Sequence, residues 1–120
     1  MSEIKNFKDL IVWQRSMQLV TSVYEVTSKY PKEELYGLMS QSRRCSVSIP
    51  SNIAEGHKRG TRKDYRNFLT FSRGSLAELE TQLLIANNLK YIELGSIESM
   101  LQEIEEISKM LTSLINKLAD

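Results

Sequence analysis

Apolar residues recur at intervals of three and four along four long segments of this 120-residue chain, and this feature restricts its fold most strongly. Such spacing gathers them on one side of an α-helix. It predicts helices over residues 8–28, 32–55, 61–89 and 96–118. In the first helix, the predicted core-facing residues are Leu10, Trp13, Met17, Val20, Tyr24 and Thr27. No segment shows the period-two alternation of a strand.

Turn and cap residues fix the predicted boundaries. The residue before a proline leaves the helical region, so the first helix ends at Tyr30. Pro50 lies inside the second predicted helix, where it predicts a kink; a break into two helices is the alternative. Residues 56–60, GHKRG, predict a loop. Thr61 then predicts an N-cap, with Asp64 three residues later.

Short connections force consecutive helices to lie antiparallel, and the prediction is an all-α, up-down-up-down four-helix bundle. The length suits one domain over residues 1–120. The longest apolar runs are of four residues, such as Leu10–Trp13, so the sequence predicts no transmembrane helix. The N-terminus lacks the apolar stretch of a signal peptide. One cysteine allows no internal disulfide, so we expect a cytoplasmic protein.

Charge is unevenly distributed along the chain. Residues 41–75 carry eight Lys or Arg against Glu55 and Asp64, whereas residues 76–120 carry three basic and eight acidic residues. A basic and an acidic patch are therefore expected. The basic patch is a candidate to bind phosphate. Alternatively, the basic patch of one subunit pairs with the acidic patch of another.

The third helix has more apolar surface than a monomer needs. Phe71 and Ile85 fall on the side opposite its core-facing leucines, with Gly74 between them. A glycine inside a helix costs about 1 kcal/mol against alanine, which suggests a close approach of another backbone. Phe71, Gly74 and Ile85 are therefore predicted to form a homo-oligomer interface.

Four sequence strings show a family resemblance. They are FKDLIVW at residues 7–13, ELYGL at 34–38, QSRRCSVSIPSNIAEG at 41–56 and GSLAELETQL at 74–83. In this order the chain resembles the four-helix proteins encoded by intervening sequences within bacterial 23S rRNA genes. Cys45 departs from the pattern, in which alanine is common at this position.

This resemblance implies an up-and-down bundle assembled as a ring-shaped homopentamer. It also implies kinship in fold with accessory proteins of diversity-generating retroelements, which bind nucleic acid and contact a reverse transcriptase. The family has no established enzymatic activity.

The candidate nucleic-acid site is a basic cluster that begins at the predicted loop. Its members are Lys58, Arg59, Arg62, Lys63 and Arg66. Free N–H groups at the start of the third helix add to its attraction for phosphate. Arg43 and Arg73 are candidates to join from neighbouring helices, and His57 and Tyr65 are candidates to stack on bases. The alternative is a solvated loop, or cations paired with the acidic fourth helix of a neighbouring subunit.

No catalytic or metal-binding pattern stands against this interpretation. The stretch 56–61 lacks the spacing of a phosphate-binding Walker loop and follows no strand. One histidine and one cysteine cannot make a structural zinc site. Cys45 and His57 would lie about 18 Å apart on a continuous helix. A di-iron bundle needs two Glu-x-x-His motifs, and none is present. We therefore expect no enzyme, no cofactor and no metal.

Polar residues near the apolar stripes form the last candidate set: Gln41, Ser48, Asn52, Glu55 and Arg73. A buried hydrogen-bond network that fixes helix register and the subunit interface is one interpretation. A polar patch shaped for a partner is the other.

The sequence hypothesis is a non-enzymatic homo-oligomer that binds RNA or DNA, RNA in particular, through residues 58–66. The alternative is a protein–protein scaffold that docks a partner such as a reverse transcriptase or a ribosome-associated factor. Such a scaffold would use the exposed side of the third helix or the acidic last helix. No membrane partner is expected.

Overall fold

Four long α-helices make up most of residues 6–119, the part of the chain that the computed structural model describes. The elements in chain order are η1 (Phe7–Asp9), α1 (Ile11–Thr27), η2 (Lys32–Glu34), α2 (Leu38–Arg59), α3 (Arg62–Asn88) and α4 (Leu94–Lys117), where η marks a short 3-10 helix. These residues contain no strand. The predicted all-α, four-helix class is confirmed.

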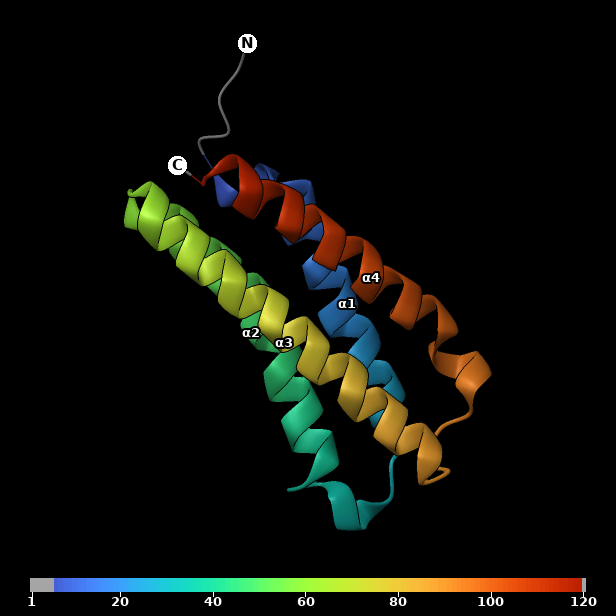
Figure 1. Ribbon diagram of the computed structural model, residues 1–120. Helices are drawn as coiled ribbons and strands as arrows, with labels where there is room; N and C mark the ends of the chain where they lie inside the picture. The colour runs from blue at the N-terminus through green and yellow to red at the C-terminus, as the bar shows by residue number, and fades with distance from the viewer. Residues whose placement is uncertain (1–5, 120) are drawn as a thin grey trace.

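The helices form a four-sided bundle measuring 47 × 25 × 22 Å. Helix α1 packs on α2, α2 on α3, α3 on α4, and α4 on α1, whereas no Cα atoms of the diagonal pairs lie within 8 Å of each other. Consecutive helices run in opposite directions in Figure 1, so the start of α1, the α2–α3 junction and the end of α4 lie at one end. None of the helices in the described residues is both long enough and apolar enough to span a bilayer.

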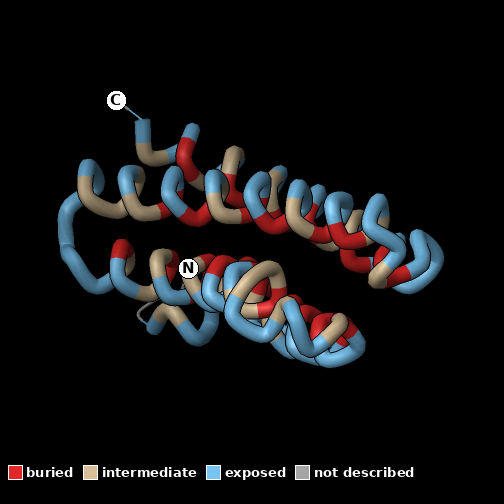
Figure 2. Tube along the Cα trace, turned by 90° about the horizontal axis from the view of Figure 1, so that it is seen from below, coloured by how far each residue is buried: buried red, intermediate tan, exposed pale blue. Residues whose placement is uncertain are grey.

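One hydrophobic core fills the bundle, and Figure 2 shows the buried residues along the inward sides of the helices. Its largest fully buried side chains are Leu19, Val23, Ile49, Ile53, Leu69, Leu76, Leu79, Leu83, Ile97, Ile104, Ile107 and Leu111. Each fully buried leucine or isoleucine stabilises the fold by about 1.5–3 kcal/mol relative to exposure.

The predicted core-facing side of α1 was only partly right: Thr27 is buried, and Leu10 and Trp13 are partly buried against the core. Its buried residues are Val12, Ser16, Leu19, Val23, Val26 and Thr27. Met17 is instead 44% exposed and Tyr24 is 42% exposed. Helix α1 carries apolar residues on two sides, and spacing alone cannot say which side meets the core. The true side is less obvious because it contains Ser16, whose hydroxyl is hidden by donating to the Val12 carbonyl at 2.7 Å.

Helix α2 differs from its prediction at both ends. It begins at Leu38 rather than at residue 32, because residues 32–34 form a separate 3-10 helix. It runs through Pro50 as one helix, so the alternative of two separate helices was wrong, while the kink stays a prediction. It also continues to Arg59, across most of the predicted loop.

Small residues bring α2 and α3 close together. A Cβ atom added to Gly56 would lie 2.6 Å from the Cβ of Phe68, far inside van der Waals contact. The buried Ser72 hydroxyl of α3 donates to the Ile49 carbonyl of α2 at 2.8 Å. The α2–α3 hairpin therefore depends on a missing side chain and a cross-helix hydrogen bond.

Candidate nucleic-acid interface

A two-residue junction, rather than a loop, separates α2 from α3. Gly60 ends α2 in the left-handed region with φ 90°, a conformation that favours glycine. Thr61 then caps α3, and its hydroxyl oxygen accepts from the Asp64 N–H at 3.1 Å. The predicted N-cap is confirmed. The tight turn holds the end of α2 and the start of α3 side by side.

The five predicted cations cluster around this junction. Lys58, Arg59, Arg62 and Lys63 are exposed, and Arg66 is half-buried. Neither Lys58 nor Lys63 forms a hydrogen bond or ion pair with any described residue. Their ammonium groups are therefore free to meet an anion.

Arg59 is partly engaged within its own helix. Its Nη2 donates to Glu55 Oε2 at 2.8 Å, and its guanidinium carbon lies 4.9 Å from the centre of the Phe68 ring. Its bond to Glu55 raises the pKa of Arg59, so it stays charged. Both partners are about half exposed, so this ion pair is weak. Phosphate can therefore compete for the guanidinium.

Arg62 ties the cluster to the last helix. Its Nη2 donates to the Lys117 carbonyl at 3.0 Å, at the end of α4. A cation is favourable there because the carbonyl end of a helix carries partial negative charge. Arg62 thus has a structural task that the sequence did not reveal, and Lys117 joins the cluster.

Packing adds one more cation from the start of the chain. Helix η1 contacts α2, and Phe7 lies against the second half of α2, which brings the exposed Lys8 to the same end. We call this region the basic end. It comprises Lys8, Lys58, Arg59, Arg62, Lys63, Arg66 and Lys117. Asp9, Glu55 and Asp64 are the acidic residues among them, so positive charge dominates.

The half-buried Arg66 has a side-chain nitrogen without a hydrogen-bond partner among the described residues. This nitrogen, Nε, is closed off from solvent. Burying a polar N–H without a partner costs free energy, which a small movement of this side chain toward an anion would relieve.

The two predicted stacking residues face each other. The rings of His57 and Tyr65 meet edge to face, with centres 5.5 Å apart and planes at 89°. Burial of Tyr65 raises the pKa of its hydroxyl. A flat platform open to a base is therefore not formed by this pair, and the basic end rests on its charges.

Arg43 and Arg73 do not join the cluster. Arg43 donates to the Thr27 hydroxyl at 2.9 Å and stacks over the Tyr24 ring. Arg73 donates to the Thr112 hydroxyl of α4 at 3.1 Å. Each arginine links two helices away from the junction.

The predicted polar network is divided among separate places. Gln41 is exposed, and Glu55 is engaged with Arg59 at the surface. Asn52 donates to the Ser48 carbonyl within its own helix at 2.9 Å. The Ser48 hydroxyl donates to the Ser75 hydroxyl of α3 at 2.7 Å, whereas Arg73 faces α4, so the five residues do not form a single network. Their role toward a partner stays a prediction.

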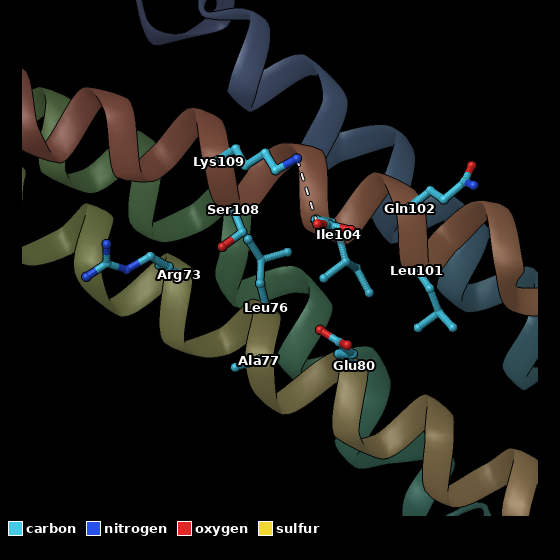
Figure 3. A pocket seen from close by; sticks show the side chains of 10 residues that line it. Arg73, Leu76, Ala77, Glu80, Leu101, Gln102, Ile104, Ser108 and Lys109 are labelled. Carbon is cyan, nitrogen blue, oxygen red and sulfur yellow. Dashed lines mark ion pairs between the residues drawn. The ribbon is translucent and has the colours of Figure 1, made fainter.

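A groove of about 620 Å³ lies between α3 and α4 (Figure 3). Leu76 and Ile104 form its floor, while Arg73 and Glu80 line its α3 side. Lys109 is paired with Glu105 of its own helix at 3.7 Å. Charges of both signs and no histidine or cysteine line it, and this gives the groove no recognisable reaction chemistry.

Reactive groups are sparse in the described residues. No cluster of three or more His, Cys, Asp or Glu there would hold a metal ion. The buried Cys45 thiol donates to the Ser75 carbonyl at 3.0 Å. Burial and the nearby Glu78 raise the pKa of Cys45 to about 11, so the thiolate needed of a nucleophile is scarce near pH 7.

Comparison with protein families identifies the family to which the chain belongs. Residues 8–113 match the family described as 23S rRNA-intervening sequence protein. The chain belongs to this family. Comparison with curated proteins gives no match.

A solved structure has the same fold. It is the crystal structure of a protein with unknown function from the S23 ribosomal protein family of Bacteroides thetaiotaomicron. The two chains are 24% identical over 88% of this chain and 98% of the other, with a TM-score of 0.81. At this identity the likeness establishes the fold alone. Neither the family description nor the name of this neighbour indicates an enzymatic activity.

Proposed function

We propose that this family member is a non-enzymatic homo-oligomer that binds nucleic acid, RNA in particular, through the basic end. The observation that carries the proposal is the gathering of seven cations at one end of the bundle, five from the middle of the sequence and one from near each terminus. Clustered cations attract the phosphate backbone and release its counterions. By resemblance to the family, the expected assembly is a ring-shaped pentamer.

Repetition supplies the strength of binding in this proposal. One basic end makes few phosphate contacts and binds weakly. Several copies on one RNA strand gain affinity, because each further contact is intramolecular. The absence of an open aromatic platform at His57 and Tyr65 favours contacts with phosphate rather than with bases.

The first experiment is a titration of a fluorescent single-stranded RNA of about 30 nucleotides with the purified protein. About five phosphate contacts on single-stranded RNA predict a roughly hundredfold loss of affinity between about 50 and 200 mM salt. Binding that is absent at 50 mM salt, with the oligomer intact, would overturn the proposal.

The decisive variant is the double substitution Lys58→Glu and Lys63→Glu, because neither lysine has a described partner within the chain. The matched control is Lys29→Glu and Lys32→Glu, which changes net charge equally at exposed positions of the opposite end. The first double variant should weaken binding by roughly tenfold or more, and the control only slightly. Equal losses would refute the basic end as the site. Arg62 is left unchanged because it also holds the end of α4.

A protein–protein scaffold is the second candidate, favoured by the exposed apolar side chains Met17, Val47 and Phe71. Its partner, such as a reverse transcriptase or a ribosome-associated factor, would bind with little salt dependence, because apolar contacts release few counterions. The salt series therefore separates the two functions.

A further inference from the structure

A groove at the basic end, which we call the α1–α4 groove, is lined mainly by apolar side chains. It lies between the start of α1 and the second half of α4 and has a volume of about 430 Å³. Its apolar lining includes Leu10 and Ile11 at the start of α1 and Met110 and Leu114 of α4. Ile11 is 57% exposed. An exposed apolar surface bordered by polar residues marks an interaction site.

The same groove carries positive charge. Two exposed lysines of α4, Lys109 and Lys117, belong to its lining, and no acidic residue is among the described residues that form it. The Lys117 ammonium group forms no hydrogen bond or ion pair with any described residue. Lys109 is paired with Glu105 at 3.7 Å, but both side chains are largely exposed, so this pair is weak. Apolar walls beside two cations suit a ligand that joins an apolar body to negative charge.

The α1–α4 groove is continuous with the basic end. Lys117 belongs to both, and the start of α1, which follows Lys8 in the chain, lies beside the end of α4 (Figure 1). The bond from Arg62 to the Lys117 carbonyl holds the backbone beside the groove to the α2–α3 junction. A strand whose phosphates contact the junction can therefore reach the groove without leaving the positive surface.

The wall that α4 contributes is held in place before any ligand binds. Arg15 Nη1 donates to Met110 Sδ at 3.6 Å, and Arg15 Nε donates to Glu103 Oε2 at 2.8 Å. A wall that is already ordered lowers the entropy cost of binding. None of the predicted interface residues of α3 lines the groove, so it does not depend on how copies of the chain associate.

We infer that the α1–α4 groove takes up one unstacked base of the bound RNA, while Lys109 and Lys117 contact the phosphates beside that nucleotide. The inference rests on the proposed function and names the part of the RNA that enters the groove. Proteins that bind single strands or flipped bases place a base against aromatic or apolar side chains. The rings of His57 and Tyr65 form no open platform at the junction, so the groove is the apolar surface left for a base there.

This arrangement selects single strands without reading their sequence. A duplex keeps its bases stacked and paired, and extracting one costs free energy. Apolar walls contact the face of a base, and every base has such a face. Ser113 is the one neutral polar side chain in the described lining, and a single hydroxyl group does not distinguish four bases.

The test compares two labelled strands of about 10 nucleotides at about 50 mM salt. One is oligouridylate, whose bases stack weakly on one another, and the other is a ribose-phosphate strand of the same length without bases. Both carry the same phosphates, so binding by charge alone gives equal affinities. The wild-type protein should bind oligouridylate roughly tenfold more tightly, as measured by fluorescence anisotropy.

One variant assigns this preference to the groove. Ile11→Ser removes an apolar wall without changing the charge, and Met17→Ser, at an exposed position of the same helix outside the groove, is the matched control. Ile11→Ser should lose most of the preference for oligouridylate and keep the wild-type affinity for the base-free strand. Met17→Ser should keep the full preference. Far-ultraviolet circular dichroism checks the fold, and Leu114→Ala repeats the test should Ile11→Ser fail to fold.

The outcomes separate this inference from the proposed function. Equal affinity of the wild type for the two strands would overturn the inference and leave the basic end standing as a phosphate site. A preference that Ile11→Ser leaves unchanged would also overturn it, because the base would then lie elsewhere. If the wild type binds neither strand, the proposed function is refuted and the inference with it.

Discussion

The two ends of the bundle use their polar groups differently. At the end opposite the basic end, one Glu34 oxygen accepts from the Leu38 N–H at 2.8 Å, and the other accepts from the Tyr91 hydroxyl at 2.9 Å. The bond from Tyr91 joins the α1–α2 connection to the α3–α4 connection. The Tyr30 and Tyr91 rings lie beside them, 5.7 Å apart.

At the basic end, two arginines bond internally and two lysines do not. Arg62 holds the end of α4, but Lys58 and Lys63 have no partner among the described residues. Charges that bond internally stabilise the fold, whereas charges left unpaired add little to stability and remain open to a ligand. The comparison contrasts a carboxylate that joins two connections with lysines that bond to no described residue, and four predictions test it.

The largest effect on stability should come from the backbone contact under the basic end. Gly56→Ala places a methyl group 2.6 Å from the Cβ of Phe68, so α2 and α3 must separate. We expect a loss of about 2 kcal/mol, or roughly 8 °C in Tm at fixed protein concentration. Thermal unfolding beside the wild type measures it. An unchanged Tm would mean that the hairpin adjusts without strain.

The next effect belongs to the opposite end. Glu34→Ala removes the acceptor for both the Leu38 N–H and the Tyr91 hydroxyl. Tm should fall by less than in Gly56→Ala, while RNA affinity stays at the wild-type level. If RNA affinity fell together with Tm, the division between the two ends would be lost.

Acid should weaken the bonded carboxylates. Hydrogen bonds from the Leu38 N–H and the Tyr91 hydroxyl lower the pKa of Glu34, and the Arg15 guanidinium lowers the pKa of Glu103. A lowered folded-state pKa contributes stability above the unfolded value of about 4.3, and this contribution is lost as pH falls toward the folded value. Tm measured below about pH 5 should fall less steeply in Glu103→Gln than in the wild type. Parallel pH profiles would contradict this role of Glu103.

The smallest effect should be on the stability of the lysine variants. Lys58→Gln and Lys63→Gln remove exposed charges without described partners, so the free energy of unfolding should change by less than about 0.5 kcal/mol. Chemical denaturation measures this change. A large destabilisation would show that these lysines stabilise the fold and are not reserved for a ligand.

Sequence spacing predicted where the helices lie. It predicted the buried side of a helix correctly in some helices and only in part in α1. In α3, the core-facing leucines lie on a single side of the helix, and Leu69, Leu76, Leu79 and Leu83 are all buried. In α1, large apolar residues lie on both sides, so the choice depended on the neighbouring helices. Met17 and Val20, together with the partly buried Trp13, instead line a surface groove between α1 and α2.

The basic cluster was only partly predictable. Its five central cations are close in sequence, and their cluster follows from the chain order. Lys8 and Lys117 join only because the helices alternate in direction, and no local pattern carries that information. The bond from Arg62 to the Lys117 carbonyl also joins residues 55 positions apart.

The sequence by itself determined the all-α class, the Thr61 cap and the family, because periodicity, local hydrogen bonding and motif order are written along the chain. Only the tertiary structure decided which side of α1 is buried, which cations share an end, and where the polar residues find their partners. Capping and helical periodicity depend on residues a few positions apart in one helix. Which side of a helix is buried depends on how all four helices pack together. This packing also leaves the cations of the basic end at the surface.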